Sequence, residues 1–200
     1  MKKSELKQVV SKAQAGEVRA FEQIYDAYYD KLAGYALRRV LDQHIAEDVV
    51  ANVFIKVLEK LPKFKWRHDH SFNGWVYRIT SNEINQYFRR QSRYVLSAPR
   101  DMEAEYASVL EHNHNAKDLE RSIDENIDYM RLHACISELR PKHQDIVHLY
   151  YFENLSHKEI AVALKMREGS VRVTLSRITK KLNQLMTGSQ LGMDVKGITL

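Results

Sequence analysis

The sequence predicts an all-α protein of two small helical domains joined by a flexible acidic linker. Three observations lead to this prediction: helical periodicity along most of the chain, few glycines and prolines, and an uneven distribution of charge. Only 7 glycines and 3 prolines occur in 200 residues, which argues against a turn-rich β-sandwich and against a Pro/Gly-rich disordered chain. Hydrophobic residues make up 44% of the chain, enough to form a core in each domain.

The first domain is expected to span residues 1–95 and carries apolar residues at helical spacing. The stripes are Phe21, Ile24, Tyr25 and Tyr28; then Val49, Val50, Val53, Phe54, Val57, Leu58 and Leu61; then Phe72, Trp75, Val76 and Ile79. Pro62 is expected to end the second helix, and Ser71 to cap the third. These helices predict a small N-terminal bundle.

A linker is expected at residues 96–128, because this stretch lacks an apolar stripe. Between 101 and 128 there are nine acidic residues and only two cationic ones. Helical spacing returns at Tyr129, Leu132, Ile136 and Leu139, and Pro141 suits the first position of a helix. We therefore expect a second domain at 129–186, followed by a loose tail at 187–200 that contains three glycines.

The second domain contains the pattern of a helix-turn-helix. Ser156 and Glu159 form a capping box at the start of the first helix, and the second helix is expected from about Glu168. The apolar face of that second helix is Val171, Leu175, Ile178 and Leu182; its opposite face is Arg172, Val173, Ser176, Arg177 and Lys180. One face to pack and one face of donors is what a DNA recognition helix requires. The alternative is an ordinary helical hairpin with a basic, solvated face.

A second basic block, residues 63–93, mixes cations with aromatic side chains. It holds seven lysines and arginines against two acidic residues, together with both tryptophans of the chain. Aromatic rings stack on unpaired bases and cations follow the phosphates, so this composition suits single-stranded nucleic acid. The alternative is that some of these aromatics, such as Phe72, Trp75 and Tyr87, build the core.

These segments together resemble the sigma factors of bacterial RNA polymerase, in particular the two-domain extracytoplasmic-function type of the sigma-70 family. The resemblance covers roughly residues 15–93 and 130–186, in the family's order. It is carried by Ala46-Glu47-Asp48-Val49-Val50 through Phe54-Ile55-Lys56, by Ser71-Phe72-Asn73-Gly74-Trp75 through Asn82 and Arg89-Arg90, and by Leu155-Ser156 through Lys180-Lys181-Leu182.

The resemblance implies a role for each segment. The implied polymerase-binding residues are Asp48, Asn52, Ile55 and Lys56. The implied minus-ten DNA residues are Lys65, Trp66, Arg67, His68, Ser71, Trp75, Asn82, Arg89, Arg90 and Arg93. The implied minus-thirty-five residues are Arg172, Val173, Ser176, Arg177 and Lys180. The loop at 65–71 would capture a flipped base, and the acidic linker would thread polymerase channels that otherwise hold nucleic acid.

The sequence departs from the family's pattern at four positions. Ala51 and Asn52 stand where glutamine and glutamate are more frequent, and Gln86 stands where aspartate is common. Lys165 stands at the bend of the helix-turn-helix, where glycine is frequent because it adopts positive φ most easily. The first two departures predict a polymerase contact that differs in detail.

The expected partners are core RNA polymerase, promoter DNA as duplex and melted strand, and a cognate anti-sigma protein. We expect no enzyme activity, cofactor or metal, because no phosphate loop or catalytic motif is present and His68 with His70 is a poor ligand pair. No signal peptide or apolar span is evident, so a cytoplasmic protein is expected. The competing hypothesis is a stand-alone helix-turn-helix repressor or activator, which would use residues 1–95 for dimerisation.

Overall fold

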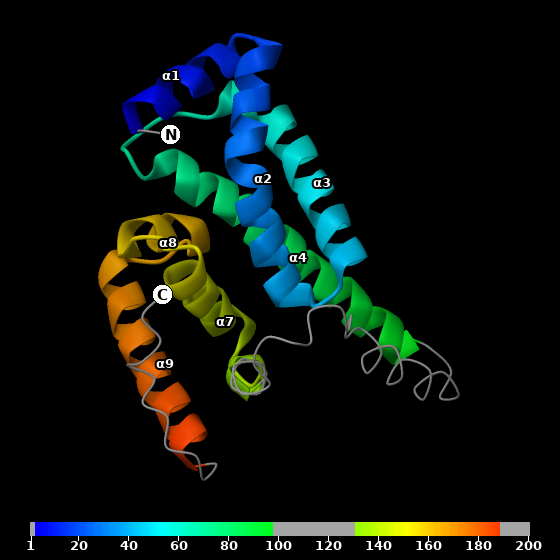
Figure 1. The fold of residues 1–200 in the computed structure, drawn as a ribbon, viewed down its shortest axis with the longest axis vertical. Helices are drawn as coiled ribbons and strands as arrows, with labels where there is room; N and C mark the ends of the chain where they lie inside the picture. The colour runs from blue at the N-terminus through cyan, green and yellow to red at the C-terminus, as the bar shows by residue number, and fades with distance from the viewer. Residues whose placement is uncertain (1–2, 98–130, 189–200) are drawn as a thin grey trace, which may run out of the picture.

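The computed structural model describes residues 3–97 and 131–188, which form helices and short connections with no β-strand among them. Figure 1 shows two groups of helices, one from each half of the chain, which meet where α8 lies against α4. The all-α prediction is confirmed over these two ranges. None of the described helices is both long enough and apolar enough to cross a membrane.

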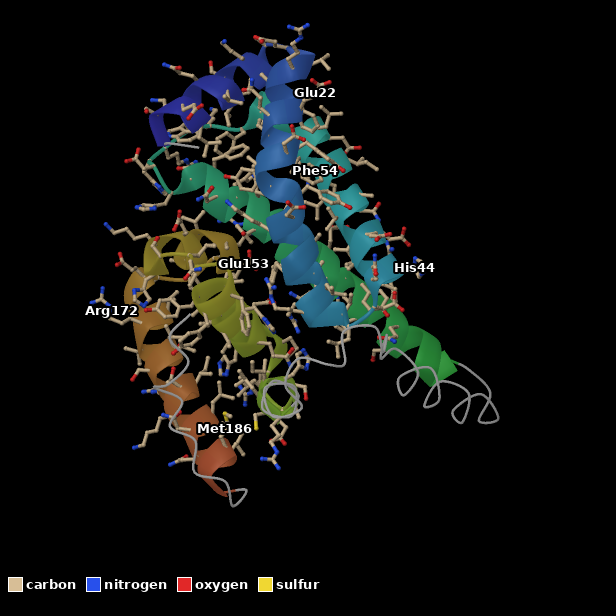
Figure 2. The ribbon with its side chains drawn as sticks, in the orientation of Figure 1. Glu22, His44, Phe54, Glu153, Arg172 and Met186 are labelled. Atoms are coloured by element: carbon tan, nitrogen blue, oxygen red, sulfur yellow. The ribbon has the colours of Figure 1, made fainter. Side chains whose placement is uncertain are left out.

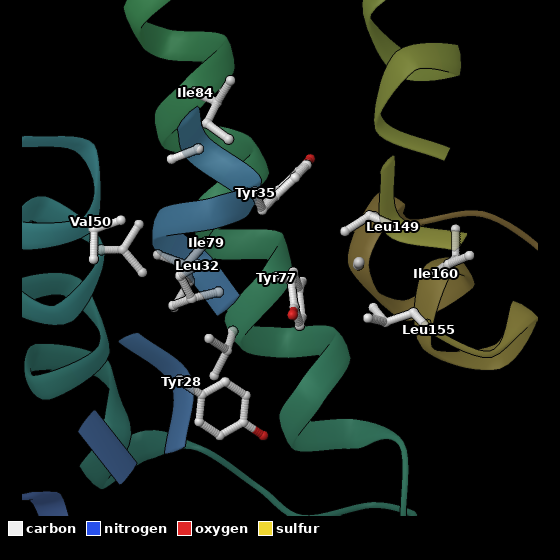
Figure 3. Close-up of a cluster of buried hydrophobic side chains, with 14 of the residues drawn as sticks. Tyr28, Leu32, Tyr35, Val50, Tyr77, Ile79, Ile84, Leu149, Leu155 and Ile160 are labelled. Carbon is white, nitrogen blue, oxygen red and sulfur yellow. The ribbon is translucent and has the colours of Figure 1, made fainter. Parts of the chain in front are cut away.

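The N-terminal group comprises α1 (Lys3–Gln14), α2 (Val18–Val40), α3 (Gln43–Lys60), the 3-10 turn η1 (Leu61–Lys63) and α4 (Ser71–Ser97). Asp42 caps α3, because its side chain accepts a 2.9 Å hydrogen bond from the amide of Ile45. Leu32, Val50 and Ile84 are fully buried where α2, α3 and α4 pack together (Figure 3). This core therefore fixes how α2, α3 and α4 pack against one another.

The C-terminal group begins with a helical segment at 131–137. It continues with α7 (Pro141–Val147), the π-helical turn η3 (His148–Phe152), α8 (His157–Leu164) and α9 (Glu168–Gly188). The predicted capping box of α8 is present: Ser156 accepts from the Glu159 amide, and Glu159 accepts from the Ser156 amide at 2.8 Å. Pro141 lies in the first turn of α7, also as predicted.

The structure corrects two details of the predicted stripes and one cap. Tyr25 and Leu58 are 40% and 56% exposed, so they lie outside the core. Ser71 is the first residue of α4, and its hydroxyl accepts from the preceding amides of Arg67 and His68 at 3.2 and 2.9 Å. The serine therefore closes the loop before the helix. The expected linker beyond residue 97 and the tail beyond 188 lie outside the described residues.

Candidate functional site

The outer face of α9 carries the five residues expected at the minus-thirty-five element, and all five are exposed: Arg172, Val173, Ser176, Arg177 and Lys180. The opposite face is buried at Val171, Leu175, Ile178 and Leu182 and packs on α7 and α8. Figure 2 shows Arg172 pointing outward, away from α4. Arg172 forms an ion pair with Glu168, one turn back, at 3.4 Å, and this pair is exposed to solvent. The recognition face is therefore open to a ligand.

A hollow of about 410 Å³ adjoins this face. Its lining combines the expected Arg172, Ser176 and Lys180 with Tyr150 and Tyr151 of η3, which were not among the expected site residues. The hydroxyl of Tyr151 lies 3.0 Å from that of Thr179 on α9. The π-helical turn thus places two phenol rings beside the recognition helix, and periodicity at 3.6 residues could not predict it.

The loop before α4 forms a second cavity, of about 420 Å³. Five of the residues expected at the minus-ten element line it: Lys65, Arg67, His68, Ser71 and Trp75. Three further residues of the basic block 63–93 also line it and were not among the expected site residues: Lys63, Phe64 and Arg78. The cavity combines four cationic side chains with two aromatic rings, which is suitable for a phosphate and a base.

The aromatic cluster beneath this cavity is structural. The rings of Phe64, Trp66, Phe72 and Trp75 lie 4.9–6.2 Å apart, and Phe72 is fully buried. The side chain of Gln14 on α1 donates to the carbonyls of Leu61 and Phe64 at 2.9 and 2.7 Å. The cluster and these two hydrogen bonds hold the loop in place. The alternative of core aromatics therefore holds for the buried Phe72, whereas the half-buried Phe64 and Trp75 join the cluster and also line the cavity.

The remaining minus-ten residues are not gathered into the cavity. Trp66 packs in the aromatic cluster, whereas Asn82, Arg89 and Arg90 lie exposed farther along α4. Arg93 belongs to α4, but its side chain lies outside the described part of the chain. The structure thus divides the predicted set into a cavity at the start of α4 and an exposed cationic stretch toward its end.

The residues expected to bind polymerase lie on α3. Asp48, Asn52 and Ile55 are exposed and follow each other along one face. Lys56 differs, because its ammonium group pairs with Glu83 of α4 at 2.5 Å and so ties the two helices together. Leu58 extends the exposed apolar area beside Ile55, and an apolar patch of this kind is typical of a protein-binding surface.

Burial shifts the pKa of several groups where the two helical groups meet. Burial, followed by the charge of Glu153, raises the pKa of Tyr77, which keeps the phenol a donor to that carboxylate at 2.7 Å. Burial also raises the pKa of Glu159, but hydrogen bonds from Ser156 and Asn73 outweigh it and hold the pKa below its ordinary value. Glu159 is therefore ionised where it meets α4.

Among residues 3–97 and 131–188, no three histidine, cysteine or acidic side chains lie close enough to hold a metal ion. The rings of His68 and His70 are 6.2 Å apart between centroids, and His70 lies 3.7 Å from Glu159. Cys135 is half-buried, and burial followed by the charge of Glu138 raises the pKa of its thiol. A raised pKa disfavours the reactive thiolate.

Comparisons with known proteins agree with the order of these surfaces. The family model for sigma-70 region 2 matches residues 24–94, and that for sigma-70 region 4 matches residues 129–182. The RNA polymerase sigma-H factor of Pseudomonas aeruginosa is 30% identical over 90% of this chain and 92% of its own length. The ECF RNA polymerase sigma factor BldN of Streptomyces coelicolor is 28% identical over 90% of this chain, which spans 65% of the length of BldN.

Solved structures support the fold. CnrH in complex with the cytosolic domain of CnrY matches 91% of this chain and 97% of its own, with a TM-score of 0.66 and 18% identity. The sigma factor RpoE of Bartonella quintana, crystallised with the anti-sigma factor NepR, gives a TM-score of 0.60 and 17% identity over 85% of this chain and 98% of its own. The two sigma-70 regions and these relatives show that the chain belongs to the extracytoplasmic-function group of the sigma-70 family.

Proposed function

We propose that the chain joins core RNA polymerase and directs it to promoters for the initiation of transcription. The observation that carries this proposal is that one chain holds both a cationic, aromatic cavity in the segment matched by sigma-70 region 2 and an exposed recognition helix in the segment matched by region 4. A duplex-binding repressor needs the helix but has no need of the cavity. The family membership likewise disfavours the stand-alone regulator.

Each surface has a proposed role. The outer face of α9 binds the major groove of the minus-thirty-five element, where Arg172 and Arg177 suit bidentate contacts to guanine or phosphate. The cavity at the start of α4 takes a base flipped from the minus-ten element, and the exposed Asn82, Arg89 and Arg90 follow the melted strand. The α3 face of Asp48, Asn52 and Ile55 binds polymerase, with Leu58 added.

The chain supplies binding energy and no catalysis of its own in this proposal, and it works in the cytoplasm with polymerase. The two structural neighbours were solved with CnrY and with the anti-sigma factor NepR, respectively. We extend this to the present chain as a further partner: a cognate anti-sigma protein that holds it from polymerase. The domain boundaries of the proposal remain 1–95, 96–128, 129–186 and 187–200.

In vitro transcription tests the function directly. Core polymerase with the full chain, on a genomic promoter library, should yield transcripts whose start sites share two sequence elements. Tight, sequence-specific duplex binding by the isolated chain at physiological salt, with no polymerase-dependent transcripts, would support the repressor instead. Exchanging the loop at 65–71 for that of another sigma factor should change the required minus-ten bases and leave polymerase binding intact.

The polymerase surface has its own test. Ile55 is 55% exposed, so Ile55→Ser should leave the thermal midpoint unchanged. The same change should reduce co-purification with core polymerase, because it removes an apolar contact from the proposed interface. Normal co-purification of a normally folded variant would show that this face of α3 does not bind polymerase.

A further inference from the structure

The C-terminal group docks on the N-terminal group through three carboxylates that face α2 and α4. They are Asp145, next to the end of α7, Glu153 after η3, and Glu159 in the first turn of α8. Figure 2 shows Glu153 on the side of the C-terminal group that faces α2 and α4, opposite to the side that carries Arg172. A surface of buried, paired charges specifies one orientation of the two groups.

Asp145 is the centre of this contact, since it is 1% exposed. Its two oxygens accept from Tyr35 at 2.8 Å, Arg39 at 3.0 Å, Ser81 at 2.8 Å and Asn85 at 3.2 Å. All four donors belong to α2 and α4, so the carboxylate is satisfied entirely by the other helical group. A buried carboxylate is tolerated only with such partners. Asp145 therefore favours the docked arrangement, in which all four donors are present.

Two further contacts extend along the same face. Glu153 accepts from Tyr77 of α4 at 2.7 Å and pairs with Arg38 of α2. Glu159 accepts from Asn73 of α4 at 2.9 Å. Figure 3 shows Tyr35 and Tyr77 on the side of α2 and α4 that faces Leu149 and Leu155, so apolar packing accompanies the polar contacts. The contact thus runs along α4 from Asn73 to Asn85.

Gly74 allows α8 to approach α4 closely. A Cβ atom added at this glycine would lie 2.5 Å from Cβ of Val162 and 2.9 Å from the carbonyl oxygen of Glu159. Glycine within a helix is destabilising relative to alanine, and Gly74 has an ordinary helical φ that any residue adopts. What Gly74 provides is room for α8.

This close approach brings α8 into the wall of the cavity at the start of α4, where it engages Arg78 while Lys65 and Arg67 stay exposed. Val162 forms part of the wall of the cavity that holds Lys65, Arg67 and Trp75. Arg78, another wall residue, donates through both Nε and Nη2 to the carbonyl of Val162, the former at 2.9 Å. A phosphate at this arginine would therefore have to displace a backbone acceptor. The outer face of α9 remains exposed in the same arrangement.

We propose that the free chain closes on itself, with α8 and η3 docked on α2 and α4 as an internal cover over the minus-ten surface. Nucleic acid occupies the whole cavity, including Arg78, only in an open state, in which Asp145, Glu153 and Glu159 have left their partners. The inhibitory consequence rests on the proposed function, whereas the docking itself does not. When a ligand binds only a minor state, its apparent affinity is lower than its intrinsic affinity in proportion to the fraction of chains in that state.

The full chain with Gly74→Ala provides the test, and Gly169→Ala is the matched control. Both replace a helical glycine, but a Cβ at Gly169 meets nothing within 4 Å. Small-angle scattering without nucleic acid should give a larger radius of gyration for Gly74→Ala than for wild type and for Gly169→Ala. Affinity for a short, labelled single-stranded DNA of mixed sequence should rise about tenfold, as expected for an open state near 10% in wild type.

Glu153→Gln supplies a second variant on the docking partner, because it weakens the contacts with Tyr77 and Arg38 without altering α4. It should expand the chain and raise DNA affinity in the same direction. Unchanged scattering and unchanged affinity in both variants would overturn the proposal, as would expansion with no gain in affinity. If the wild-type chain is extended in scattering but supports normal transcription, the closed state is wrong and the proposed function stands. If the wild-type chain is closed but yields no transcripts with polymerase, the proposed function is wrong and the closed state stands.

Discussion

The two nucleic-acid surfaces of this chain differ in how they are built and in whether other helices of the same chain contact them. The face on α9 comes from one helix whose outer side chains are all exposed. The cavity at α4 is formed by a loop and a helix start, and Val162 of the other helical group closes part of it. A surface made by one helix follows from periodicity alone, whereas a surface made by several segments depends on tertiary contacts that can also cover it.

The largest predicted effect acts where the two helical groups meet, through His148. This histidine is 1% exposed, and its ring lies 6.3 Å from that of Tyr35 and 5.3 Å from that of Phe152. Burial, followed by the charge of Arg39, lowers its pKa to about 3. The unfolded chain takes up a proton near pH 6.5 and the folded chain only near pH 3. The stabilisation is complete above pH 6.5 and is lost as the pH falls toward 3.

Urea unfolding as a function of pH measures this effect. Between pH 6.5 and 3 the free energy of unfolding should fall by about 1.4 kcal/mol per pH unit from this group alone. His148→Phe keeps an aromatic ring among Tyr35 and Phe152 and removes the titration, so its profile should be flatter by that amount. Acid protonation of the carboxylates contributes equally to both proteins. Parallel profiles would show that the buried imidazole does not titrate as proposed.

The next effect comes from a substitution on the buried face of α9. Leu175 is 6% exposed on the inner face of α9, so Leu175→Ala should lower the stability of the C-terminal helices by about 2–5 kcal/mol through lost burial and a cavity. Circular dichroism should show a lower thermal midpoint, and promoter use should fail with it. A variant that unfolds like wild type would contradict the packing of α9 on α7 and α8.

A smaller effect comes from substitutions on the exposed face of α9. Arg172→Ala and Arg177→Ala should each reduce promoter use roughly ten- to a hundredfold, since a bidentate contact to guanine is worth about 1–3 kcal/mol. Thermal stability should not change, because the exposed pair of Arg172 with Glu168 contributes little. In transcription assays, a base contact would remove one minus-thirty-five preference, whereas a phosphate contact would weaken all promoters with a shallower salt dependence.

Normal transcription by both normally folded arginine variants would show that α9 does not read DNA in this way. The pair of experiments on α9 therefore separates packing from recognition: the leucine change lowers stability first, and the arginine changes lower promoter use alone. The α4 surface does not divide so simply, because Ser71 and Trp75 line the cavity and also hold its loop and aromatic cluster.

Local features of the fold were predictable from the sequence. The capping box at Ser156, the proline in the first turn of α7 and the buried face of α9 each depend on neighbours within one or two helical turns. The π-helical turn η3 was not predictable, because its spacing departs from the helical period. Tyr25 was assigned to the core but is exposed, since periodicity identifies an apolar face without showing whether a neighbour covers it.

The candidate site was predictable in part for the same reason. Cations and aromatics near residue 65 indicated nucleic acid, and five of the expected residues line the cavity. The sequence could not show that Arg78 turns into the cavity or that Lys56 pairs with Glu83 across two helices. Nor could it show that Asp145 finds four donors on α2 and α4. Such pairings join residues far apart in the chain and exist only after packing.

The smallest effect sharpens the view of α9 as a locally built surface. Lys165 ends α8 with φ 51° and ψ 55°, in the left-handed region that favours glycine. For a residue with a Cβ this conformation costs roughly 1–2 kcal/mol, part of which is offset because glycine loses more chain entropy on folding. Lys165→Gly should therefore stabilise the C-terminal helices by about 0.5–1 kcal/mol, measured as a higher urea midpoint.

Lys165→Ala keeps the strain and removes the same charge, so it should give no gain. Equal midpoints for the two variants would show that the bend between α8 and α9 stores no backbone strain, and that the side chain rather than φ determines the stability of this turn.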